Sequence, residues 1–143
     1  MIQTHSTARQ GFSLMELMIA IAILAILAIV AVPNFLGYLE SAKKSKATQT
    51  LNLFKSAITM YNAQIGKLPD RLQDLVKKPL DEAAAKKWQT GGYFEKQDLP
   101  LDPWNSDYGY KPTPGGKHLY ELWSYGPNGK GSPEKEWISV WEL

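Results

Sequence analysis

The chain has 143 residues, of which 44% are hydrophobic, and its 16 Lys and Arg oppose 14 Asp and Glu. This length suits one domain, or a small domain with an appendage, because domains most often contain ~100–150 residues. A formal net charge of +2 excludes the strongly basic footprint of a nucleic-acid-binding protein, and the lack of cysteine excludes disulfides, thiol catalysis and cysteine-ligated zinc.

Hydrophobic residues are concentrated in one segment near the start of the chain. Between residues 12 and 39, 23 of 28 residues are hydrophobic, against 37 of the 104 residues that follow. A helix over residues 12–33 would be roughly 33 Å long, about the thickness of the hydrocarbon core of a bilayer. The sequence therefore predicts a membrane helix followed by a polar head. A buried core helix would need a larger head to enclose it, and a secretory signal peptide usually has a shorter apolar run.

Glu16 is the one charged residue in this segment. A carboxylate at the middle of a bilayer costs up to ~2.5–3.5 kcal/mol on insertion scales. Glu16 therefore either stays solvated at the membrane interface or pairs with a cation. Because the apolar run contains no basic residue, that cation would come from a chain terminus or from another subunit.

The segment Gly11 to Leu17 reads Gly-Phe-Ser-Leu-Met-Glu-Leu and precedes the apolar run. It resembles the class III signal of type IV pilins and type II secretion pseudopilins. The resemblance implies that a prepilin peptidase cleaves between Gly11 and Phe12 and that the new N-terminus at Phe12 is methylated. It also implies an assembly role for Glu16, which would neutralise the N-terminal amine of a neighbouring subunit. Such a pair is plausible physically, because two charges that are costly alone in lipid become tolerable together.

The charges that flank the apolar run do not favour the orientation of a pilin in the membrane. Arg9 on one flank is outnumbered by Lys43, Lys44 and Lys46 on the other, which favours the opposite side from a pilin. These lysines and Lys55 indicate a solvated helix face, with contact to lipid phosphates as the less favoured alternative. A cytoplasmic N-terminus and an external head therefore follow from the resemblance alone.

Pro33 predicts either a kink or the end of the first helix, because it has no N–H and crowds the preceding turn. Beyond it, apolar residues recur at spacings of four and three. They are Ala47, Leu51, Phe54, Ile58, Tyr61 and Ile65. This stripe predicts an amphipathic helix that ends at Gly66, so we expect one helix of more than fifty residues with an apolar first half and an amphipathic second half.

Shorter elements are predicted after this helix. Asp70 is the expected N-cap of a second helix that runs to about Lys78, and residues 81–87 predict a further helical turn. The expected strands of a small antiparallel sheet are residues 108–111, 119–125 and 137–141, joined by turns at 114–116 and 127–129. All five tryptophans follow residue 87. They favour an aromatic core in a small head over a stacking platform for a ligand.

Three segments of the head extend the resemblance to the major pseudopilins of type II secretion. The first is Tyr61-x4-Gly66-x2-Pro69, with Leu68 where an aromatic residue is usual. The second is Leu99-Pro100-x-Asp102-Pro103-Trp104-x2-Asp107-Tyr108-x-Tyr110, and the third is Ser124-x-Gly126-Pro127-Asn128-Gly129. The resemblance implies an α+β, pilin-like fold in which the long helix packs on the small antiparallel sheet.

In this family the last loop usually holds a calcium ion. The candidate ligands here are Ser124, Asn128, Glu134 and Glu136. Calcium prefers six to eight oxygen ligands, but Asn128 stands where an aspartate is usual and Lys135 separates the two glutamates. A metal-free loop held by Trp137 and Trp141 is therefore the favoured alternative, and no cofactor is certain.

No catalytic constellation is predicted. His5 and His118 offer no triad or metal cluster, and the setting of Asp102 and Asp107 is typical of turns. We therefore expect a structural protein rather than an enzyme.

The predicted organisation is a leader over 1–11, a transmembrane and filament-core segment over 12–39, and a periplasmic head over 40–143. By resemblance, the protein is a single-pass inner-membrane precursor that polymerises into a periplasmic filament and drives export of folded proteins. The expected partners are further copies, the prepilin peptidase, minor pseudopilins, the inner-membrane assembly platform and the membrane, but not nucleic acid. A type IV pilus subunit and a membrane-anchored binding domain that does not polymerise are the alternatives.

Overall fold

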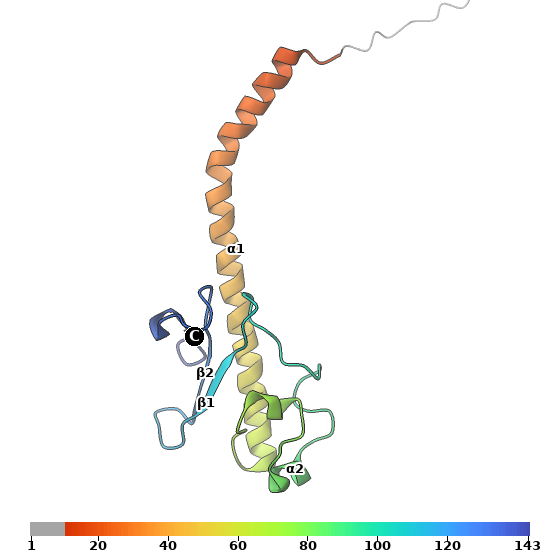
Figure 1. Ribbon diagram of the computed structural model, residues 1–143, viewed down its shortest axis with the longest axis vertical. Coiled ribbons are helices and arrows are strands. Elements are labelled where there is room, and N and C mark those ends of the chain that lie inside the picture. Colours follow the sequence, from red (N-terminus) through yellow and green to blue (C-terminus); the bar gives the residue numbers. More distant parts are fainter. Residues whose placement is uncertain (1–10) are drawn as a thin grey trace, which may run out of the picture. The chain divides into compact units, whose positions relative to one another are not determined.

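The computed structural model describes residues 11–143, which divide into two units, one ending at Leu39 and the other spanning Glu40–Leu143. Helix α1 (Leu14–Ile65) contains 52 residues and contributes to both units (Figure 1). It continues past Pro33, so the helix does not stop at the proline. The prediction of one helix longer than fifty residues is confirmed.

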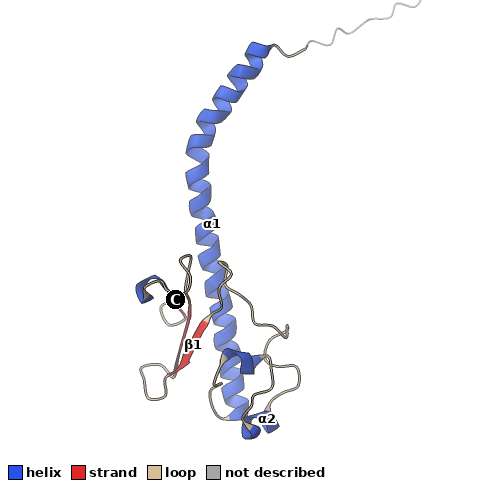
Figure 2. Cartoon of the chain, viewed as in Figure 1, coloured by secondary structure: helices blue, strands red, loops and turns tan. Residues whose placement is uncertain are grey.

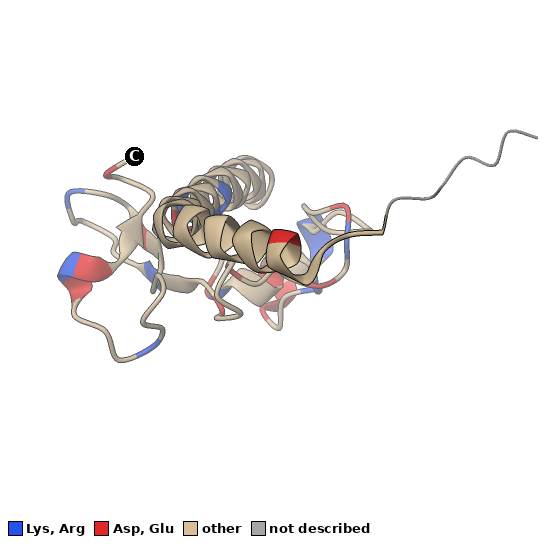
Figure 3. Cartoon of the chain, turned by 90° about the horizontal axis from the view of Figure 1, so that it is seen from above, with Lys and Arg blue, Asp and Glu red and all other residues tan. Residues whose placement is uncertain are grey.

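The first unit is an apolar helical segment. From residue 11 to residue 39, every side chain that the structure describes is exposed, including Ile29 at 75% and Phe35 at 66%. Its length and composition suffice to cross a membrane. Figure 3 shows how few charged residues this part of α1 carries. An apolar surface of this extent needs lipid or other protein to cover it.

The second unit places the second half of α1 beside a three-stranded antiparallel sheet (Figure 2). The strands are β1 (Gly109–Pro112), β2 (Tyr120–Ser124) and β3 (Ile138–Ser139), in the order β1-β2-β3. Gly109 lies opposite Trp123, and Ser124 opposite Ile138. The predicted α+β architecture is confirmed. β1 has the expected length but lies one residue later, and it ends at a proline, which cannot donate to a ladder. β2 and β3 are shorter than expected, and β2 ends just before a turn with Gly126 at a φ of 71°.

The core of this unit is the predicted stripe of α1. Its six residues, Ala47, Leu51, Phe54, Ile58, Tyr61 and Ile65, are all buried. Phe54 lies 5.1 Å from Tyr108 and 5.0 Å from Phe94 between ring centroids, in tilted geometry. Aromatic side chains thus fill much of the core, as the sequence predicted. The stripe ends where Gly66, at a φ of 90°, donates its amide to the carbonyl of Asn62.

The expected helix from Asp70 to Lys78 is wrong. The chain forms only a 3-10 helix, η1 (Leu72–Leu75), which follows Arg71 rather than Asp70. The carbonyl of Asp74, which would accept from the amide of Lys78 in the expected helix, accepts instead from Trp88 Nε1 at 2.8 Å, and the carbonyl of Leu75 accepts from the amide of Tyr93 at 2.7 Å. Within a helix the carbonyl of Leu75 would have had no donor, because residue 79 is a proline and lacks an N–H.

The short helix α2 (Glu82–Lys87) is confirmed, with the Asp81 carboxylate accepting from the amide of Ala84.

Alkaline pH is expected to destabilise the head through Tyr61. Burial, followed by the nearby negative charge of Asp74, raises the pKa of the Tyr61 hydroxyl from 10.0 to about 12. The unfolded chain therefore releases a proton that the folded chain keeps. The protonated Tyr61 hydroxyl contributes its full stabilisation to the head below the pKa that this group has in the unfolded chain, and this contribution is lost as the pH rises through its pKa in the folded chain. Thermal melts of the full chain in detergent should show a decline over this window that is shallower in Tyr61→Phe. Tyr38→Phe, which alters an exposed ring, should leave the decline unchanged. An unchanged slope in Tyr61→Phe would contradict the assignment.

Candidate functional site

The start of α1 carries a capping box. The carbonyl of Ser13 accepts the first helical hydrogen bond, from the amide of Leu17 at 3.2 Å. The Ser13 hydroxyl accepts from the amide of Met15 at 3.3 Å, and Glu16 Oε2 accepts from the amide of Ser13 at 3.4 Å. Ser13 and Glu16 thus satisfy amides that the first turn leaves without helical partners. Our reading of the sequence missed this role, although the Ser-x-x-Glu spacing is its usual signature.

The capping contact satisfies the hydrogen-bonding capacity of Glu16 in part but does not neutralise its charge. In a single chain its carboxylate caps its own helix and lies at the positive end of the helix dipole. Its formal charge, however, has no basic side chain to pair with between residues 17 and 39. A cation from outside this segment is therefore still needed for a neutral pair in lipid.

The predicted cleavage site lies just before the helix. Gly11 and Phe12 precede α1 in an irregular segment, and the Phe12 side chain is 86% exposed. A peptide bond in such a segment can enter a peptidase without unfolding a helix. The rest of the leader, residues 1–10 with His5 and Arg9, lies outside the described residues.

Asp102 organises the turn that follows Pro100. Its carboxylate is buried and accepts three hydrogen bonds: Oδ1 from the amides of Trp104 at 3.0 Å and Ser106 at 2.8 Å, and Oδ2 from the hydroxyl of Ser124 at 2.7 Å. The Ser124 hydroxyl accepts in turn from the amide of Gly126 at 3.1 Å. Asp102 therefore joins the Asp-Pro-Trp turn to the end of β2. The segments 99–110 and 124–129, which both carry the resemblance to pseudopilins, are thus connected by hydrogen bonds.

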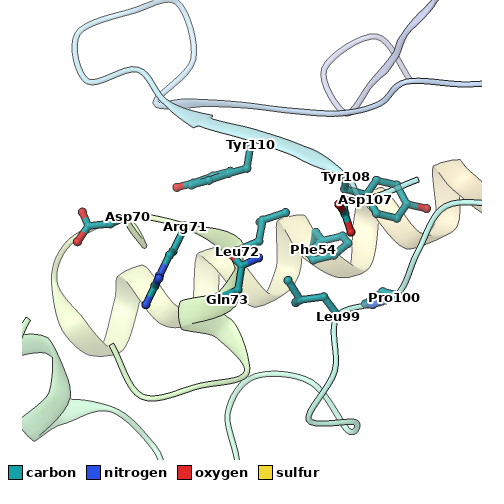
Figure 4. A pocket seen from close by; sticks show the side chains of 10 residues that line it. All are labelled: Phe54, Asp70, Arg71, Leu72, Gln73, Leu99, Pro100, Asp107, Tyr108 and Tyr110. Carbon is teal, nitrogen blue, oxygen red and sulfur yellow. The ribbon is translucent and has the colours of Figure 1, made fainter. Parts of the chain in front are cut away.

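Asp107 has a different environment from Asp102. It is exposed, and its Oδ2 accepts from Lys130 Nζ at 2.8 Å. Asp107 also lines a cavity of about 170 Å³ beside Tyr108 and Tyr110, whereas Asp102 does not (Figure 4). The cavity is smaller than the ~300–1,000 Å³ of most small-molecule sites. The two carboxylates therefore have separate structural partners, in agreement with the prediction of turn chemistry for Asp102.

The candidate calcium ligands do not converge on one point. Ser124 is buried on the inner face of β2 and donates to Asp102. Asn128 Nδ2 donates to Glu136 Oε2 at 2.8 Å, so these two form a pair of their own. Glu134 lines a groove on the outer face of the sheet, with Trp123 among its neighbours. Among residues 11–143 no group of three or more His, Asp or Glu side chains is placed to hold a metal. The donor set does not fit a calcium ion.

The two units together define a class of protein: an apolar, exposed helix with a lone carboxylate at its start, continuing into a small α+β head, is the organisation of pilin-like subunits. The family model for the type II secretion system protein G matches residues 34–141, and the model of the prokaryotic N-terminal methylation motif matches residues 6–32.

Individual relatives agree with these matches. The chain is 37% identical over 124 residues to the type II secretion system core protein G of Klebsiella pneumoniae, covering 85% of this chain and 86% of that protein. It is 35% identical over 138 residues to the core protein G of Escherichia coli K12, covering 94% and 92%. The crystal structure of the major pseudopilin of enterohaemorrhagic E. coli superposes with a TM-score of 0.65 at 30% identity, covering 78% of this chain and 96% of that one. The chain belongs to the protein G family of the type II secretion system and is a subunit of its pseudopilus.

Proposed function

We propose that the chain loses residues 1–11 and then polymerises through residues 12–39 into a periplasmic filament that drives folded proteins across the outer membrane. The observation that supports this most is the exposed apolar surface of the first unit, which contains one carboxylate and no basic side chain after it. In a precursor this surface would contact lipid, and in a filament it would contact the same segment of other copies. The same side chains serve both states, because both surroundings are apolar.

The proposed topology is a single pass through the inner membrane with the head in the periplasm. The partners would be the prepilin peptidase, other copies of the chain, minor pseudopilins and the assembly platform of the inner membrane. Capping by Ser13 supports the order of events, because it leaves the Gly11–Phe12 bond outside the helix until cleavage. The role is mechanical rather than catalytic: the carboxylates of Asp102 and Asp107 are engaged in structural contacts.

Mass spectrometry of the N-terminus tests the first step. Protein extracted from membranes should begin at Phe12 and carry one extra methyl group. Replacing Gly11 with leucine should retain the leader, because the resemblance places cleavage directly after this glycine. Gly37→Ala is the matched control, since a Cβ at Gly37 would meet nothing within 4 Å. An unmodified N-terminus before residue 12 in the unaltered chain would refute the proposal and favour an anchored domain that does not polymerise.

A further inference from the structure

The last loop of the head is closed by its own side chains. We call residues 124–137 the latch. At its start Ser124 holds Asp102, and at its end Trp137 Nε1 donates to the carbonyl of Ser132 at 3.0 Å. Between them, the Asn128 amide donates to Glu136. The oxygens of Ser124 and Glu136 that a hard cation would bind already accept hydrogen bonds within the protein, from the amide of Gly126 and from the side chain of Asn128.

A lysine ammonium supplies the positive charge in this region. Lys130 Nζ lies 2.8 Å from Asp107 Oδ2 and so links the latch to the turn that begins at Asp102. The same hydrogen bond raises the pKa of Lys130, whose ammonium is already protonated at neutral pH. Two lysines and two glutamates within the latch, Lys130, Lys135, Glu134 and Glu136, leave it without the excess negative charge that calcium sites usually carry.

Aromatic packing holds the other side of the latch. The rings of Trp137 and Trp123 stack with centroids 5.0 Å apart and planes within 5°. Tyr125 meets both rings edge-on, at 5.1 Å from Trp137 and 6.0 Å from Trp123. This contact joins the end of the latch to the outer face of β2. Trp141, which we expected to help, packs instead against His118 and Tyr120.

We propose that this latch closes without a divalent cation, and that the ion pair of Lys130 with Asp107 links it to the turn that begins at Asp102. Three kinds of contact carry the proposal: the buried Ser124–Asp102 hydrogen bond, the Lys130–Asp107 ion pair and the stack of Trp123 on Trp137. The proposal concerns the stability of the head and does not depend on whether the chain polymerises.

Thermal melting of the full chain in detergent tests the proposal. Tryptophan fluorescence should give the same Tm in excess EDTA and in millimolar CaCl₂, within about 2 °C. A structural calcium ion at 100 times its Kd would instead raise the Tm of a domain of this size by roughly 10 °C or more. A rise of more than about 2 °C in calcium overturns the proposal.

A matched pair of variants tests the part of Lys130. Lys130→Gln should lower the Tm by about 1–3 °C, equally in EDTA and in calcium, because an exposed ion pair contributes modestly. Lys135→Gln removes the same charge from the same loop, and Lys135 forms no ion pair with residues 11–143, so its Tm should equal that of the unaltered chain. If Lys130→Gln melts at the same temperature as Lys135→Gln, Lys130 has no part in the latch and this element of the proposal is overturned.

Discussion

Replacing Glu16 with glutamine is expected to reduce pseudopilus assembly at least tenfold while leaving membrane insertion and cleavage intact. In the proposed filament, the carboxylate neutralises the amine of a neighbouring Phe12. Without that charge, each joining subunit would place an unpaired ammonium in an apolar environment, at a cost of about 2.5–3.5 kcal/mol. Pelleted filament relative to membrane-bound subunit, measured by immunoblot in secreting cells, gives the ratio directly.

The choice of glutamine separates the two roles that the structure gives to Glu16. Glutamine keeps an oxygen that can accept from the amide of Ser13, so the helix remains capped while the charge is lost. The converse variant, Ser13→Ala, removes the hydroxyl cap, at a cost of about 1 kcal/mol, but leaves the charge in place. We expect Ser13→Ala to assemble. If the glutamine variant assembles normally and the alanine variant does not, capping rather than charge pairing is the function of Glu16.

Replacing Asp102 with alanine is expected to lower the stability of the head by about 3–5 kcal/mol. The change leaves the part-buried amides of Trp104 and Ser106 and the buried hydroxyl of Ser124 without their acceptor. Such a loss is a large part of the 5–15 kcal/mol that typically stabilises a domain. Thermal melting followed by tryptophan fluorescence should show a Tm lower by roughly 15 °C or more.

Two further variants identify the cause of that loss. Asp98→Ala removes an exposed aspartate four residues earlier and should change the Tm by no more than about 2 °C. Asp102→Asn keeps one oxygen for the turn amides but turns an NH₂ group toward Ser124, so an intermediate loss is expected. An Asp102→Ala variant as stable as Asp98→Ala would show that the turn and β2 hold together without this carboxylate.

Sequence reasoning succeeded where the decisive interactions are local or periodic. The apolar run and its lone Glu16 are read directly from the order of residues, because a bilayer selects composition over a fixed length. The stripe from Ala47 to Ile65 is buried as predicted, since residues at spacings of three and four share one face of a helix. The helical turn predicted over residues 81–87 forms as α2, whose capping contact, from the amide of Ala84 to Asp81, spans only three residues.

Reasoning from local pattern failed where distant residues compete for the same groups. Residues 70–78 have the signature of a helix, but Tyr93 and Trp88 take the carbonyls of Leu75 and Asp74, so only a 3-10 turn remains. The residues around 70–78 do not predict those donors, which lie 14 or more residues further along the chain.

The head's last loop shows the same division. Its sequence supplied the oxygen atoms of a calcium site, Ser124, Asn128, Glu134 and Glu136, and the reason for doubting it, a low negative charge. The direction of each side chain was decided by the tertiary structure. The alternation of β2 buries Ser124 against Asp102 and turns Trp123 outward to Trp137, while Lys130 reaches Asp107 across 23 residues of chain. The sequence alone thus determined which part of the protein is apolar enough to cross a membrane and which single acid that part carries, because composition and short spacings decide both. The tertiary structure alone decided which donors and acceptors in the head form hydrogen bonds with one another. These partners are distant in the chain, and each polar atom can form only a few hydrogen bonds.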